Sequence, residues 1–190
     1  IDEISGGRFI LGIGAGSSAE PPRGDNYAFG FPMDSPVARF EEALQITLNL
    51  LREGRTTFNG QFYQAQDCTI QPRGPRPEGP PVFIAAVRPR MMRLAARYAD
   101  IWGVPVPTNT PEGYMRFEEP LAAACAEVGR DPSTLAKMAI VGLDTVTDVR
   151  PARNPYGESL AGHTNEVATA LRRFAEAGYQ HISVALFPNS

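Results

Sequence analysis

The chain has 190 residues, of which 43% are hydrophobic and 21% are charged, and its formal net charge is -3. This composition is typical of a globular domain with one sizeable core, and it excludes a disordered chain. The excess of acidic over basic residues argues against a nucleic-acid-binding surface, and the longest apolar runs, such as residues 80–87, are too short to cross a bilayer. We therefore expect neither nucleic acid nor membrane as a partner.

One helix and one hairpin are predicted in the first third of the chain. Ser35 is placed to cap a helix that has Pro36 at its first position, and Gly54 is placed to end that helix. Apolar residues recur between them at helical spacing. The Asn59-Gly60 pair within residues 56–63 then predicts a tight β-hairpin, which we interpret as a surface appendage.

Strands and helices alternate through the rest of the chain. The predicted strands are 8–13, 82–86, 101–106, 139–146 and 181–187, and the further predicted helices are 89–99, 111–128 and 165–177. Asn109 and Glu112 have the spacing of a capping box for the helix at 111–128. Apolar strands separated by helices predict a buried parallel sheet, and therefore an α/β protein. The pattern suits an open doubly wound sheet or the later part of a (β/α)8 barrel.

The segment Gly14-Ala15-Gly16-Ser17, at the end of the first predicted strand, is the first candidate site. With Ala19 it matches a loose GxGxxA dinucleotide motif, but Pro21 and Pro22 prevent the helix that this motif requires. Two interpretations remain: a glycine-rich turn without a ligand, or a strand end where a planar ligand approaches the backbone closely.

The second candidate site follows the strand at 82–86. The strand ends in small residues and a helix begins at a proline, so free backbone N–H groups and the helix dipole favour an anion there. Arginine side chains add positive charge, although arginines near a helix start are often only solvated. The residues of this candidate phosphate site are Ala85, Ala86, Val87, Arg88, Arg90 and Met91.

The cysteines and histidines do not predict a metal site. Cys68 and Cys125 are far apart in sequence and form no CxxC pair, and we expect both to be reduced thiols in the core. His163 and His181 are also well separated. No metal ligand is therefore assigned.

Six segments, in their order along the chain, resemble the bacterial luciferase-like monooxygenase family of flavin- and F420-dependent oxidoreductases. They are SGGRF running into LGIGAG (5–16), RFEEAL (39–44), TFNGQFY (57–63), PPVFIAA (80–86), PRMMRLAARYAD (89–100) and EAGYQHI (176–182). The resemblance implies a (β/α)8 barrel, of which this chain is similar to strands 4 to 8 with a small β-hairpin insertion. It implies one domain over residues 1–190 that lacks the first strands and the last helix.

The resemblance also implies a cofactor, coenzyme F420 or FMN. Its ring would lie at the strand end formed by Gly14, Ala15, Gly16 and Ser17, and its phosphate at the turn from Ala85 to Met91. Trp102 would lie near the end of the barrel where the cofactor binds, or would be an aromatic residue that only packs in the core. Some F420-dependent members carry a catalytic glutamate where this chain has Ser17, and a serine hydroxyl does not titrate near neutral pH. No catalytic residue is assigned.

Three functions remain open at this stage. The first is a cytoplasmic bacterial oxidoreductase or monooxygenase acting on a small organic substrate as a homodimer, with a slight preference for F420. The second is a flavin-binding protein without catalytic activity, and the third is an oligomeric structural remnant. The chain begins at Ile1 without a leader, and 190 residues are fewer than the roughly 250 of a full barrel, which together predict a truncated form.

Overall fold

The computed structural model describes residues 1–16, 25–104, 109–144, 160 and 163–187 of an α/β protein. The chain forms two compact units, residues 1–82 and 83–190, and each is described by itself. The assignment of a single domain stays a prediction. Within the described residues, no helix is long and apolar enough to cross a membrane.

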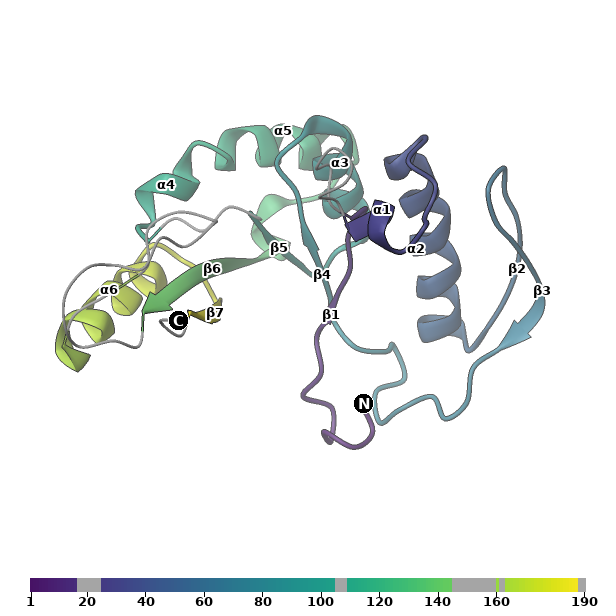
Figure 1. Cartoon of the computed structure of the whole chain (residues 1–190), viewed down its shortest axis with the longest axis horizontal. Helices are drawn as coiled ribbons and strands as arrows, with labels where there is room; N and C mark the ends of the chain where they lie inside the picture. The colour runs from purple at the N-terminus through teal and green to yellow at the C-terminus, as the bar shows by residue number, and fades with distance from the viewer. Residues whose placement is uncertain (17–24, 105–108, 145–159, 161–162, 188–190) are drawn as a thin grey trace. The chain divides into compact units, whose positions relative to one another are not determined.

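The first unit combines a short strand, two helices and a hairpin. Its elements are β1 (Leu11–Gly12), α1 (Asp25–Ala28), α2 (Pro36–Glu53), β2 (Arg55–Asn59) and β3 (Gln64–Thr69). β1 is shorter than the predicted strand at 8–13, because ladder pairing is confined to its middle: the Leu11 N–H donates to the Pro81 carbonyl at 2.9 Å. Helix α1 was not predicted. Figure 1 shows the hairpin of β2 and β3 running alongside α2, against which it packs.

Helix α2 ends as the sequence predicts but begins differently. Gly54 has φ 76° and its N–H donates to the Leu50 carbonyl, so the predicted glycine stop is confirmed. Ser35 occupies the N-cap position with φ 52° and makes no side-chain capping bond, so its predicted capping role is wrong. Phe40, Leu44 and Leu48 form the buried face of the helix.

The predicted hairpin is confirmed, but its tight two-residue turn is not. Asn59 pairs with Gln64, so the loop comprises the four residues 60–63. The second strand, β3, therefore begins at Gln64 and not directly after Gly60. The contacts that open this turn belong to the candidate site described below.

The second unit holds a parallel sheet with the strand order β4-β5-β6-β7. Its elements are β4 (Val82–Ala85, which begins at the last residue of the first unit), α3 (Pro89–Tyr98), β5 (Ile101–Gly103), α4 (Glu112–Met115), α5 (Glu118–Glu127), a 3-10 turn η1 (Pro132–Thr134), β6 (Ala136–Asp144), α6 (Thr164–Glu176) and β7 (His181–Phe187). Every one of these strands pairs in parallel with the next, which confirms the predicted α/β architecture.

The helix predicted at 111–128 is two helices in the structure. α4 ends at Met115 and α5 begins at Glu118. Pro120 explains the break, because a proline has no N–H for the carbonyl four residues earlier and its ring crowds that carbonyl. The N-cap of α4 is Pro111 without a side-chain bond, so the predicted capping box is wrong.

Two predicted strand ends lie outside the described residues. β5 is described as a strand to Gly103, and residues 105–106 of the strand predicted at 101–106 are not described. Residues 145–146 of the strand predicted at 139–146 are not described either. β6 begins at Ala136, three residues before its predicted start, because the Ala136 N–H donates to the Asp100 carbonyl and extends the ladder with β5.

Aromatic residues form much of the core between α4, α6 and the sheet of the second unit. The rings of Tyr114, Phe174 and Tyr179 contact one another with centroid distances of 5.5–5.9 Å. The buried Tyr114 hydroxyl donates to the Ile140 carbonyl at 2.7 Å and accepts from the Ile140 N–H at 3.0 Å. One side chain thus satisfies both polar backbone groups of a residue in β6.

Candidate functional site

The turn after β4 is held in place by β5. The Ala86 N–H donates to the Gly103 carbonyl at 2.9 Å, and the Ala86 carbonyl accepts from Nε1 of Trp102, also at 2.9 Å. Ala86 and Trp102 are buried. Because both backbone groups of Ala86 are engaged, the start of the turn has little freedom to move. Trp102 is therefore a packing aromatic that also fixes the predicted phosphate turn.

Gly103 lets this part of the sheet pack closely. A Cβ at this position would lie 2.7 Å from the Met138 carbonyl oxygen and 2.8 Å from the Phe83 ring. Contacts this short require a shift of neighbouring atoms, so any side chain at position 103 would push β5 away from its neighbours.

The start of α3 has the features of an anion site. Arg88 is the N-cap, with extended backbone, and Pro89 opens the helix. N–H groups in the first turn of a helix point outward from its end and favour a negative charge. The side chains of Arg88 and Arg90 are exposed, and Val87 and Met91 are half-buried. The side chain of Arg93 forms an exposed ion pair with Glu127, with 3.5 Å between Nη1 and Oε2.

The glycine segment, which is the first candidate site predicted from the sequence, lies in the first unit and borders a cavity of about 260 Å³. Gly14, Ala15 and Gly16 form part of its lining, together with residues of α2 and the hairpin. Gly16 has φ +84°, and a Cβ there would collide with the Asn26 side-chain amide, so glycine is required. At Gly14 a Cβ would meet nothing within 4 Å. Ser17 lies outside the described residues.

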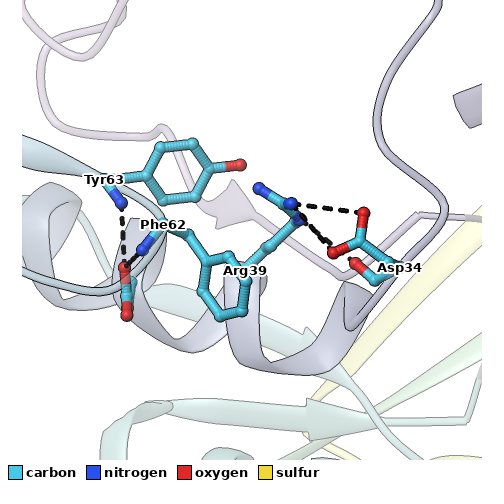
Figure 2. A network of polar contacts seen from close by, with 5 residues as sticks. Asp34, Arg39, Phe62 and Tyr63 are labelled. Atoms are coloured by element: carbon cyan, nitrogen blue, oxygen red, sulfur yellow. Dashed lines mark hydrogen bonds and ion pairs between the residues drawn. The ribbon is translucent and has the colours of Figure 1, made fainter.

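An arginine of α2 forms the polar edge of this cavity. Arg39 donates from Nε to the Asp34 carbonyl at 3.1 Å and from Nη2 to the Asp34 carboxylate at 3.0 and 3.2 Å. Its guanidinium lies 4.4 Å from the centroid of the Phe62 ring. Figure 2 shows the Tyr63 hydroxyl directed toward the same guanidinium. These contacts leave Arg39 only 21% exposed.

Glu42, one turn further along α2, holds the tip of the hairpin. Its carboxylate accepts the N–H groups of Gln61, Phe62 and Tyr63 at 2.8–3.0 Å, and Figure 2 shows two of these bonds. Desolvation alone would raise the pKa of Glu42, but these N–H groups and the charge of Arg39 outweigh it and lower the pKa below its ordinary value. The three N–H groups face Glu42 and not the opposite strand, which explains the four-residue turn.

Gly60 gives this carboxylate its space. A Cβ on Gly60 would collide with Oε2 of Glu42 and would lie 2.5 Å from the Phe58 ring. Sequence analysis found Gly60 as a turn residue but missed Glu42 and Arg39 as site residues. Their spacing of three positions on one helix, just before an Asn-Gly hairpin, was the available signal.

Neither cysteine contributes to these sites. Cys125 is buried, and burial raises the pKa of its thiol, as expected for an inert core residue. Cys68 lies exposed on β3, so its prediction as a core thiol is wrong; on that short hairpin its side chain faces away from the core. Among the residues that the structure describes, no group of three His, Cys, Asp or Glu could hold a metal ion.

Comparison with known proteins gives the family. Residues 1–145 match the model of the family described as luciferase-like monooxygenase. This chain belongs to the luciferase-like monooxygenase family. The recognition made from the six sequence segments is thereby confirmed.

Relatives within the luciferase-like family extend well beyond this chain. Phthiodiolone/phenolphthiodiolone dimycocerosates ketoreductase of Mycobacterium bovis is 33% identical over 144 residues, which cover 75% of this chain and 36% of the relative. The chain thus spans little more than a third of the length of such curated relatives.

Solved structures support the fold. An F420-dependent secondary alcohol dehydrogenase, in complex with an F420-acetone adduct, has a TM-score of 0.74 at 16% identity, covering 100% of this chain and 67% of that one. The coenzyme F420 dependent tetrahydromethanopterin reductase from Methanopyrus kandleri has a TM-score of 0.71 at 16% identity, covering 100% and 72%. This luciferase-like chain is a partial (β/α)8 barrel, as predicted; the open doubly wound sheet is not supported.

Proposed function

We propose that this protein is an oxidoreductase that uses coenzyme F420 or FMN to act on a small organic substrate. The proposal rests chiefly on the turn between β4 and α3, where a fixed backbone, a helix start and two exposed arginines come together. F420 and FMN both carry a phosphate that such a turn suits. The F420-dependent relatives favour F420 of the two.

The cofactor phosphate would lie in the second unit. In the second unit, the first N–H groups of α3 and the side chains of Arg88 and Arg90 would hold the phosphate, while Trp102 keeps the turn in place. The donor set of this turn fits a phosphate group.

The cofactor, once bound, would supply the redox chemistry: hydride transfer for F420, or oxygen activation by reduced FMN. The residues of this chain would bind and orient it. A homodimer and a cytoplasmic location remain predictions from the family resemblance. No catalytic residue is assigned among the predicted positions.

Cofactor titration of the full chain tests the proposal. The Arg88→Ala/Arg90→Ala double variant should bind FMN and F420 about 5- to 150-fold more weakly, which corresponds to roughly 1–3 kcal/mol for lost charge-assisted hydrogen bonds. Riboflavin, which lacks the phosphate, should bind both proteins equally. Arg97→Ala, an exposed arginine in the last turn of the same helix, is the matched control and should leave all affinities unchanged.

The outcomes separate the alternatives. Unchanged FMN and F420 affinity in the double variant would remove Arg88 and Arg90 from the site. Failure of the wild-type chain to bind either cofactor would contradict the proposed function. Tight binding without turnover of any carbonyl or alcohol substrate would favour a flavin-binding protein without catalytic activity.

A further inference from the structure

The cavity of the first unit has apolar walls. It measures about 260 Å³, and its apolar lining residues include Ile13, Phe31, Pro36, Phe40, Ala43 and Tyr63. Drug-sized ligands occupy roughly 300–1,000 Å³, so this volume suits one bicyclic ring or the end of a longer molecule. Apolar walls of this kind favour a ligand that gains by leaving water.

The charge at the edge of the cavity is cancelled within the chain. Arg39 carries the one charge among the described lining residues, and Asp34 pairs with it through both carboxylate oxygens. The Phe62 ring covers one face of the guanidinium. An anionic ligand would have to compete with Asp34 for Arg39, and a neutral ligand would not.

One wall of the cavity belongs to the hairpin tip. Tyr63 lines the cavity, is 39% exposed, and has its N–H bound to the Glu42 carboxylate at 3.0 Å. Glu42 also binds the N–H groups of Gln61 and Phe62, and Gly60 leaves room for that carboxylate. A hairpin tip is normally among the most mobile parts of a fold. Here these contacts hold the backbone that carries the Tyr63 side chain.

We propose that this cavity binds an uncharged, largely apolar ring of a small organic ligand, with Tyr63 as a specificity-determining residue and Glu42 as the residue that positions it. Asp34 sets the preference for an uncharged ligand by occupying Arg39. The inference deepens the proposed function by naming a substrate class, and it gives this cavity to the substrate in place of the cofactor ring that the family resemblance puts at Gly14, Ala15 and Gly16. Its link to a redox substrate rests on the proposed function.

A matched pair of probes tests the ligand class. Calorimetric titration of the full chain should show that neutral 2-naphthol binds about tenfold or more tightly than naphthalene-2-sulfonate, a ring of the same size with a negative charge; tenfold corresponds to roughly 1.4 kcal/mol. Equal affinities, or tighter binding of the sulfonate, would overturn the uncharged class.

Releasing Arg39 should reverse part of this preference. Asp34→Asn should strengthen sulfonate binding about tenfold, because the guanidinium then becomes available to the anion. The Asp34→Asn/Arg39→Gln double variant should lose that gain. Glu53→Gln removes one negative charge at the far end of α2 and should change neither affinity. A similar gain in Glu53→Gln would assign the effect to net charge and overturn the role of Asp34.

A double-mutant cycle tests the hairpin wall. Tyr63→Ala and Glu42→Gln should each weaken 2-naphthol binding about three- to tenfold, and together they should weaken it no more than Tyr63→Ala alone, because Glu42 acts through Tyr63. Far-UV circular dichroism checks that each variant is folded. Additive losses would reduce Glu42 to a structural role, and unchanged affinity in Tyr63→Ala would remove the cavity as the binding site.

The probes also separate this inference from the proposed function. Cofactor titrations depend on Arg88 and Arg90, whereas the naphthol titrations depend on Tyr63, Glu42 and Asp34. Cofactor binding without selective naphthol binding would overturn the present inference alone. Selective naphthol binding without cofactor binding would overturn the proposed function and leave a ring-binding pocket.

Discussion

In the second unit the backbone of the candidate site is held from inside, by the buried Trp102 against the Ala86 carbonyl. In the first unit the hairpin tip is held from α2, near the surface, by the Glu42 carboxylate on three N–H groups. In both regions one side chain satisfies backbone polar groups. The two sets of hydrogen bonds differ in solvent exposure, and a hydrogen bond that is shielded from water costs more free energy to break.

The two regions should respond differently to pH and salt. The turn after β4 depends on packing and should be insensitive to pH and salt. The hairpin tip depends on an ionised carboxylate near the surface and should respond to pH.

Removal of Trp102 should have the largest effect on stability. Trp102→Ala deletes a fully buried side chain from β5 and should lower the free energy of unfolding by about 3–5 kcal/mol. Urea unfolding followed by far-UV circular dichroism measures the loss.

Trp102→Phe separates packing from hydrogen bonding in the same experiment. It keeps an aromatic ring but leaves the Ala86 carbonyl without its donor, and should cost about 1–3 kcal/mol. A loss below about 1 kcal/mol for Trp102→Ala would show that the turn is not held from inside.

Tyr114→Phe should have an intermediate effect. It removes only the hydroxyl that pairs with both backbone groups of Ile140, and should lower the free energy of unfolding by roughly 1–3 kcal/mol without changing the packing of the ring. The same urea series measures it. Stability equal to that of the wild type would mean that water replaces the hydroxyl in β6.

The smallest effect should be the pH response of the hairpin tip. The pKa of Glu42 in the folded chain is lower than its ordinary value of 4.5, so its stabilising contribution is present above pH 4.5 and is lost as the pH falls through the lower folded value. The amide NMR signals of Phe62 and Tyr63 should therefore titrate with a midpoint below 4.5. In Glu42→Gln this titration should disappear, and a midpoint at or above 4.5 would contradict the assignment.

Local signals in the sequence predicted most of the fold. The apolar runs that became β4 and β7, the helix from Pro36 to the Gly54 stop, and the parallel order of the second unit all follow from patterns within a few residues. One error arose where a distant group competes with a local preference. Asn59-Gly60 favours a tight turn, but Glu42, 18 positions before Gly60, draws the following N–H groups to itself.

The candidate site divides in the same way. The sequence alone determined the glycine segment at 14–17 and the arginine-bearing turn at 85–91 as places where a strand ends, and also the family, because these depend on residue type and order. Only the tertiary structure decided that Trp102 holds Ala86, that Asp34 neutralises Arg39, and that Tyr63 lines a cavity with Gly16. The first and third of these contacts join residues far apart in sequence, and the second joins residues five positions apart. The free energy of all three depends on burial and distance, which the order of residues does not specify.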